Sequence, residues 1–189
     1  MPKPKHIEPK PTSYRGQLFR SKLEARWAVF LDYHFIIDSW QYEPHTFSLP
    51  QKGWTYTPDF LFRAGPFVGY IEVKPKEISE QQEYVYTQML QQLGGVPLYL
   101  GIGTFYKRKV PTLQVLGQSQ KLKLHEIPWL PDAKDAIQMA RNFRFDLAHA
   151  APPIRSGSLS NVHGHIMEWA EQQRKGIKKK KPQHRRKKK

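Results

Sequence analysis

The amino-acid sequence predicts an α/β (α+β) fold in which a mixed central sheet is flanked by helices. Three observations indicate it. Apolar residues recur at helical spacing after Ser21, two β-prone aromatic segments follow, and a second helical pattern leads to a short apolar run. The expected order is helix, three strands, helix, strand, which we write αβββαβ. The 189 residues suffice for one domain with a hydrophobic core, plus appendages.

The first helix is expected over residues 21–36, where Ser21 suits an N-cap. Its apolar face is formed by Leu23, Trp27, Phe30, Leu31, His34 and Phe35. At about 100° per residue, Glu24 falls on this face, between the directions of Leu31 and Phe35. A carboxylate in that place needs a partner, because burying an unpaired charge is costly.

The remaining elements follow from β-propensity, helix stops and turn residues. Residues 40–49 predict a strand interrupted at Pro44, and residues 57–60 lie within a second strand. The full set comprises strands at 40–49, 54–63, 67–74 and 96–102, a helix at 77–93 stopped by Gly94 and Gly95, weaker strands near 112–116 and 121–127, and helical segments at 131–146 and 160–174.

The net charge of +15 is concentrated at the C-terminus. Residues 174–189 hold 11 of the 31 Lys and Arg and no acid, so the rest of the chain has 20 basic and 16 acidic groups. Such a tail is expected to be disordered and to contact nucleic acid without reading its sequence. A solvated tail or a localisation signal is the alternative. The sequence divides into a flexible arm at 1–13, a main domain at 14–150 with its core at 19–105, a loop with a helix at 151–173, and this tail.

Several classes of protein are excluded by what the sequence lacks. It has no Cys, and therefore neither disulfides nor a thiolate nucleophile. No apolar run is long enough for a transmembrane helix, so no membrane partner is expected. The N-terminus shows no signal peptide, which favours an intracellular protein. There is no Ser/His/Asp arrangement and no Gly-rich phosphate loop.

The chemistry is predicted to centre on Asp59, Glu72 and Lys74. Residues 64–66 form a short turn that joins two neighbouring strands as a hairpin, so the carboxylates of Asp59 and Glu72 can approach each other. A period of two puts Glu72 and Lys74 on one face of their strand and Ile71 and Val73 on the other. Carboxylates held together repel, and a hard divalent cation such as Mg²⁺ resolves the conflict. The alternative is a cross-strand ion pair on the surface.

These residues resemble the PD-(D/E)XK nuclease superfamily, through Pro58-Asp59 followed by Glu72-Val73-Lys74. The αβββαβ order and an acidic residue on the first helix, here Glu24, add to the resemblance. It covers roughly residues 14–105 and implies a restriction-endonuclease-like core. Residues 19–59 look most like phage-encoded members and the end-cutting endonucleases of transposons. A phage-encoded member would act in the host cytoplasm.

The resemblance implies a DNA endonuclease that depends on Mg²⁺, or on Mn²⁺ in its place. Asp59 and Glu72 would hold the metal, together with the backbone carbonyl of Val73. Glu24 would hold the metal or a metal-bound water from outside these direct ligands. The metal would polarise the scissile phosphate and lower the pKa of a bound water. Lys74 would orient or deprotonate that water. The products would carry a 5′-phosphate and a 3′-hydroxyl.

Further residues are candidates for nucleic-acid binding, each about as well explained by solvation or packing. They are Arg15, Arg20, Lys22, Gln82, Tyr86, Lys107, Arg108, Lys109, Arg174 and Lys175. Glu43, beside Pro44, is either a further acid near the site or a loop carboxylate. Two alternative functions stay open: a resolvase of Holliday junctions or other branched DNA, and a non-catalytic nucleic-acid binding protein with the same fold. An RNA substrate and a homodimer are also compatible with the sequence.

Overall fold

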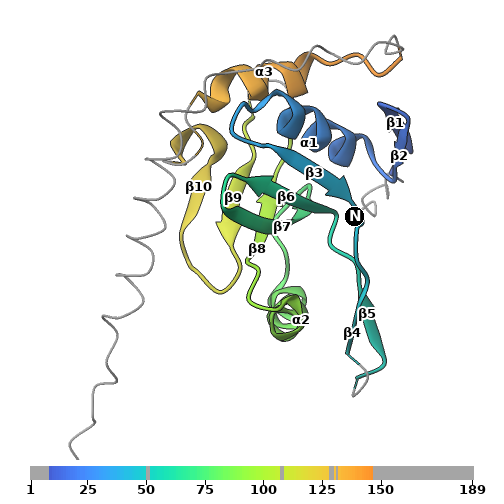
Figure 1. Ribbon diagram of the computed structural model, residues 1–189, viewed down its shortest axis with the longest axis vertical. Helices are drawn as coiled ribbons and strands as arrows, with labels where there is room; N and C mark the ends of the chain where they lie inside the picture. Colours follow the sequence, from blue (N-terminus) through green and yellow to red (C-terminus); the bar gives the residue numbers. More distant parts are fainter. Residues whose placement is uncertain (1–8, 50–51, 107–108, 128–129, 131, 147–189) are drawn as a thin grey trace, which may run out of the picture.

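The structure is a computed structural model that describes residues 9–49, 52–106, 109–127, 130 and 132–146. Within these residues a six-stranded mixed sheet forms the centre, one α-helix lies on each side of it, and a third α-helix packs against one of these helices (Figure 1). The strand order in the sheet is β10-β9-β8-β7-β6-β3. The predicted α/β class with a mixed central sheet and flanking helices is therefore confirmed.

The elements follow one another along the chain with short connections. They are β1 (Thr12–Tyr14), β2 (Gln17–Phe19), α1 (Lys22–Tyr33), β3 (Ser39–Tyr42), β4 (Phe47–Leu49), β5 (Trp54–Tyr56), β6 (Phe60–Ala64), β7 (Phe67–Lys74), α2 (Glu80–Leu90), the 3₁₀ turn η2 (Gln91–Leu93), β8 (Leu98–Ile102), β9 (Thr112–Val115), β10 (Lys121–Lys123), the 3₁₀ turn η3 (Leu124–Glu126) and α3 (Ala133–Asn142).

One pair of neighbouring strands in the sheet is parallel, and the other pairs are antiparallel. β3, β6 and β7 are antiparallel neighbours, β7 and β8 run parallel, and β9 and β10 continue antiparallel. Two short hairpins, β1–β2 and β4–β5, stand outside this sheet. Because β7 and β8 are parallel, their C-terminal ends reach the same edge of the sheet, where Lys74 is level with Ile102.

The sheet separates two hydrophobic clusters. Figure 1 shows α1 and α3 on one side of the sheet and α2 on the other. Ile71 and Val73 of β7 pack with the α1 and α3 side chains, whereas Tyr70 packs with α2 and the β4–β5 hairpin. The alternation of β7 therefore turns Glu72 and Lys74 toward the α2 side, as the period of two predicted.

Helix α1 begins as predicted and ends early. The Ser21 side chain accepts a hydrogen bond from the backbone N–H of Glu24, which caps the first turn. Trp27 lies across β8, where Gly101 leaves room for its ring. The expected end at residue 36 is wrong, because the chain becomes extended at His34.

The segment at 54–63 is not one strand, as predicted, but two. β5 pairs with β4, whereas β6 pairs with β3 and β7. Residues 57–59 form the break between them, so Asp59 precedes β6 instead of lying within a strand. Pro58 has no N–H to donate to a neighbouring strand. The carbonyl of the next residue, Asp59, accepts a hydrogen bond from the N–H of Glu43.

Smaller differences concern the ends of elements. The helices expected at 77–93 and 131–146 span Glu80–Leu90 and Ala133–Asn142, and the strand expected at 121–127 stops at Lys123. The β1–β2 hairpin was not predicted, and its first strand includes the last two residues of the expected arm. Residues 1–8, the segment at 151–173 and the tail at 174–189 lie outside the described residues. No described helix is long and apolar enough to cross a membrane.

Gly101→Ala is expected to lower the free energy of unfolding by about 1–3 kcal/mol, as overpacking a close contact does. A Cβ at this position would lie 2.6 Å from Cζ2 of Trp27, so α1 would have to shift away from β8. Urea denaturation measures the effect, with Ser119→Ala at an exposed position as the control. Equal midpoints for Gly101→Ala and the wild type would contradict this packing of α1.

Candidate active site

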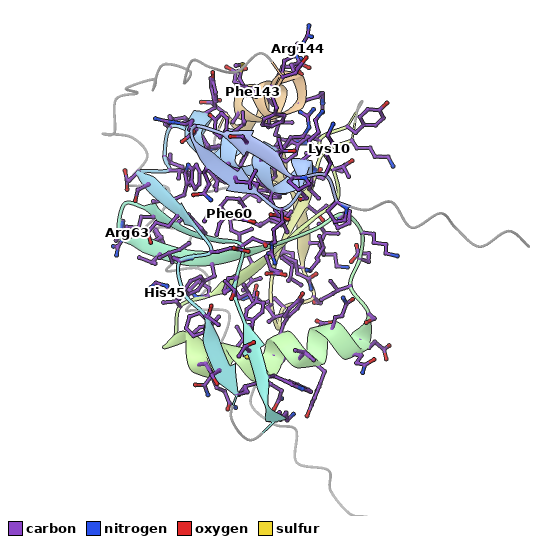
Figure 2. All side chains as sticks on the ribbon, turned by 90° about the vertical axis from the view of Figure 1, so that its right-hand side faces the viewer. Lys10, His45, Phe60, Arg63, Phe143 and Arg144 are labelled. Atoms are coloured by element: carbon purple, nitrogen blue, oxygen red, sulfur yellow. The ribbon has the colours of Figure 1, made fainter. Side chains whose placement is uncertain are left out.

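The predicted acidic residues meet where β6 begins and β7 ends. Phe60 is opposite Ile71 in the antiparallel register, which places Asp59 beside the Glu72–Lys74 end of β7. Phe60 itself lies between the α1 layer and the sheet (Figure 2) and is fully buried. The break before β6 and the burial of Phe60 together hold Asp59 at this edge.

Asp59 is 3% exposed and is held by two donors. The backbone N–H of Val73 donates to its Oδ2 at 2.7 Å, and Nη2 of Arg20 donates to its Oδ1 at 2.7 Å. The first contact ties the carboxylate to β7. The second brings in a cation from the short segment between β2 and α1. Asp59 thus joins three parts of the chain at one point.

Glu72 is 5% exposed and accepts from two tyrosines. The hydroxyl of Tyr56 donates to Oε2 at 2.9 Å, and that of Tyr86 donates to Oε1 at 3.2 Å. Nζ of Lys74 lies 2.6 Å from the same Oε1 and 5.8 Å from the centre of the Tyr86 ring. Strand β5, strand β7 and helix α2 therefore converge on this carboxylate.

The electrostatics of the site favour a positive charge next to Asp59. Burial, followed by the negative charge of Glu72, raises the pKa of Asp59 to about 8, although the Val73 N–H opposes the shift. Glu24 adds to the rise. The guanidinium of Arg20 attracts the ionised form, but 61% of its side chain is exposed, so water screens its charge.

Lys74 carries its proton. Burial alone lowers the pKa of its ammonium, but the charge and hydrogen bond of Glu72 outweigh burial and raise that pKa above its ordinary value. The pKa of Tyr86 is raised to about 12, by burial and then by Glu72, so its hydroxyl stays protonated and donates. Burial and Glu72 raise the pKa of Tyr56 in the same way.

Glu24 is buried at the start of α1, as its place on the apolar face predicted. Its Oε1 accepts from the hydroxyl of Ser21 at 2.8 Å, and its Oε2 accepts from that of Tyr42 at 2.5 Å. The backbone N–H of Arg20 also donates to Oε2. The partner that a buried carboxylate needs is thus supplied by the protein, and a role of Glu24 toward a metal stays a prediction.

The structure brings some of the other predicted residues to the carboxylates and places others elsewhere. Tyr86 and Arg20 reach the carboxylates, whereas Gln82 does not, because its side chain forms a capping box with Ser79 at the start of α2. Arg15 pairs with Asp32 at 3.0 Å and so ties the β1–β2 hairpin to α1.

Two further candidates are placed by their neighbours. Nζ of Lys22 lies 5.9 Å from the ring centre of Phe145. Lys109 lies in the segment after β8, where its carbonyl accepts from Arg141. The four remaining candidates, Lys107, Arg108, Arg174 and Lys175, lie outside the described residues.

Three residues of the site were missed or left open by the sequence. Tyr42 and Tyr56 read as ordinary strand aromatics, and nothing in their spacing indicates the carboxylates they reach. Glu43, left as either a site acid or a loop residue, lies 2.9 Å from Nε of Arg20 through its Oε1. Its positive φ of 46° marks a tight bend after β3, which brings it to Arg20.

The donor set suits a hard divalent cation. Two buried carboxylates lie close enough for one to raise the pKa of the other, and carboxylate oxygens are the ligands that Mg²⁺ uses in ones or twos, beside water. In the described residues no group of three or more His, Cys, Asp or Glu is arranged to hold a metal. A cation would therefore depend on Asp59, Glu72, main-chain oxygen and water. The role of the Val73 carbonyl stays a prediction.

Comparisons with known proteins do not identify the chain: no family model, no curated protein and no solved structure matches it.

The stability of the metal-free chain is expected to fall as pH rises from 5.5 to 8.0, relative to Asp59→Asn. Across this range the Asp59 carboxyl is ionised in the unfolded chain. In the folded chain burial and the charge of Glu72 raise its pKa, so more of it stays protonated at the lower pH, and it pairs with Arg20 as it ionises at the higher pH. The folded state then binds more protons, so its advantage is lost with rising pH. We expect the two proteins to diverge by at least about 1 kcal/mol, given 1.36 kcal/mol for each pKa unit. Urea unfolding in EDTA measures the difference, and parallel pH profiles would contradict it.

Proposed function

We propose that this chain is a divalent-metal-dependent nuclease that hydrolyses phosphodiester bonds in DNA. The observation that carries the proposal is the buried pair Asp59 and Glu72, next to a charged Lys74, at one edge of a sheet. Such a pair is unfavourable without compensating positive charge. A divalent cation would bind the two carboxylates, and a phosphate ester would bind the ammonium group of Lys74.

The order of the elements gives independent support. Setting aside the β4–β5 hairpin, the chain runs α1, β3, β6, β7, α2, β8, with three antiparallel strands followed by a parallel one. This is the αβββαβ order expected of a PD-(D/E)XK core. Glu24 lies on α1, Asp59 directly before β6, and Glu72 and Lys74 on β7, whereas the sequence led us to expect Asp59 within a strand.

In the proposed mechanism, Asp59 and Glu72 would hold Mg²⁺ or Mn²⁺, which would supply Lewis-acid activation of the scissile phosphate and of the attacking water. Tyr56 and Tyr86 keep Glu72 in position by donating to both of its oxygens. Lys74 faces the same oxygen as Tyr86 and presents a positive charge toward the phosphate.

The state of Lys74 bears on its role. Its pKa is raised by Glu72, so with Glu72 free it acts as a charged group that orients water and phosphate rather than as a base. Neutralising Glu72 removes this cause while burial, which lowers the pKa, remains. Loss of the proton from Lys74 therefore becomes easier when the charge of Glu72 is neutralised, as it would be in a metal ligand.

DNA is the proposed substrate because its phosphates match the charge at this edge. The ends of β7 and β8 lie together, so the segment with Lys109 follows the same edge as Lys74. Arg20 lies on the α1 side of Asp59 with most of its side chain exposed. The basic side chains of Arg20 and Lys74, each next to a carboxylate, suit a backbone that carries a charge at every nucleotide.

Purified protein is expected to cut plasmid DNA in Mg²⁺ or Mn²⁺ and not in EDTA. Asp59→Ala removes a ligand and Lys74→Ala removes the positive charge, so each is expected to lower the rate by a factor of about 10² or more. Agarose electrophoresis of supercoiled plasmid measures both nicking and linearisation. Lys134→Ala, an exposed lysine on α3, is the matched control and is expected to cut like the wild type.

The same assay separates the alternatives when linear duplex and a four-way junction are included. Preference for the junction would favour a resolvase, and binding without any cutting would favour a non-catalytic protein. Cleavage that survives unchanged in both Asp59→Ala and Lys74→Ala would remove this site from the proposal.

A second pair of variants distinguishes the role of Tyr86 at the carboxylate from the role of Gln82 in the helix cap of α2. Tyr86→Phe removes a hydrogen bond to ionised Glu72 and is expected to lower the cleavage rate roughly tenfold. Gln82→Ala removes part of a capping box and is expected to cost about 0.5–1 kcal/mol of stability while leaving the rate unchanged. Rates and urea midpoints measured together test both, and the reverse pattern would place the substrate near Gln82 instead.

A further inference from the structure

Arg20 is the most highly connected cation among the described side chains of the site. Its Nη2 lies 2.7 Å from Oδ1 of Asp59, and its Nε lies 2.9 Å from Oε1 of Glu43. The same Nε is 3.9 Å from Oε2 of Glu24. Three carboxylates from three parts of the chain thus share one guanidinium, which supplies the positive charge that buried Asp59 requires.

The contacts of Arg20 differ in how firmly they are held. Its backbone is fixed, because its N–H lies within hydrogen-bond reach of both the Glu24 carboxylate and the Tyr42 hydroxyl, each at 3.2 Å. Its side chain is 61% exposed, whereas that of Asp59 is 4% exposed. Water reaches the guanidinium and offsets part of the attraction that is lost when it leaves Asp59. The guanidinium can therefore leave Asp59 while its main chain stays in place.

We propose that Arg20 exchanges between two partners: it pairs with Asp59 in the metal-free chain and with a DNA phosphate when a divalent cation occupies the site. The inference rests on the proposed function. Oδ2 of Asp59 is already bound to the Val73 N–H, so Oδ1 is the oxygen for which Arg20 and a divalent cation compete. Guanidinium is well suited to the second partner, since its planar donors match phosphate geometry.

Two consequences follow from this competition. Arg20 weakens metal binding in the absence of DNA, because a cation must displace it. Arg20 strengthens DNA binding in the presence of metal, because displacement frees its donors for phosphate. Metal and DNA are therefore coupled through one side chain, and the coupling is reciprocal.

The first measurement is the affinity for Mn²⁺ alone, by titration followed with electron paramagnetic resonance. Arg20→Gln keeps a polar side chain and removes the charge, so it is expected to bind Mn²⁺ roughly fivefold or more tightly than the wild type. Arg63→Gln is the matched control, since Arg63 is an exposed arginine at the other end of β6 (Figure 2), and is expected to change nothing. Arg20→Lys, a point charge unable to span Asp59 and Glu43 as a fork, is expected to fall between the two and serves if Arg20→Gln folds poorly.

The second measurement is DNA binding by fluorescence anisotropy, with Lys74→Ala added to each protein so that the duplex is not cut. Mn²⁺ is expected to increase the affinity of Lys74→Ala for DNA roughly fivefold or more, and this increase is expected to be clearly smaller when Arg20→Gln is added, because only the direct contact of the cation with phosphate remains. An unchanged or weaker Mn²⁺ affinity in Arg20→Gln, or an increase of the same size without Arg20, overturns the inference alone. Absence of Mn²⁺ binding in every protein overturns the inference and the proposed metal site together.

Discussion

Two carboxylates with almost no access to water, Asp59 and Glu72, are the constraint on which the site depends. Each would be stable in water, but together and buried they repel, and the pKa of Asp59 rises to about 8. The protein compensates with cations attached to its own chain, Arg20 for Asp59 and Lys74 for Glu72. A structural role does not explain this arrangement well, because well-packed apolar residues are often as stable as a buried ion pair, or more so.

The fold produces this crowding by interrupting a strand. Pro58 ends the run begun by β5, so the next residue leaves the ladder and its side chain reaches the backbone of β7 through Val73. The hairpin before the break contributes Tyr56 to Glu72, and the strand after it begins with fully buried Phe60. A continuous strand from 54 to 63 would leave Asp59 in the pleat, without this contact to the neighbouring strand.

Much of this was accessible from the sequence because it depends on local periodicity. The bounds of β7, the opposite faces of Glu72 and Val73, the Ser21 cap and the burial of Glu24 all follow from spacing alone. The break at residues 57–59, the early end of α1 and the short β1–β2 hairpin depend on tertiary contacts, which a single sequence does not show. The same holds for the site: the carboxylates and Tyr86 were predicted, but the two other tyrosines that bind carboxylates were not. Tyr56 and Tyr42 meet Glu72 and Glu24 only after distant segments pack together.

The tyrosines also explain how the buried carboxylate of Glu72 is satisfied. A hydroxyl whose pKa is raised remains a donor at neutral pH, so Tyr56 and Tyr86 donate hydrogen bonds to Glu72 without bringing a charge. The protein thus gives its carboxylates two kinds of partner: neutral donors, as Tyr56 and Tyr86 are for Glu72, and cations, as Lys74 is for Glu72 and the exposed Arg20 is for Asp59. Arg20, with its fixed backbone and exposed side chain, is of the second kind, and the removal of such a cation is compatible with the surrounding hydrogen bonds staying intact.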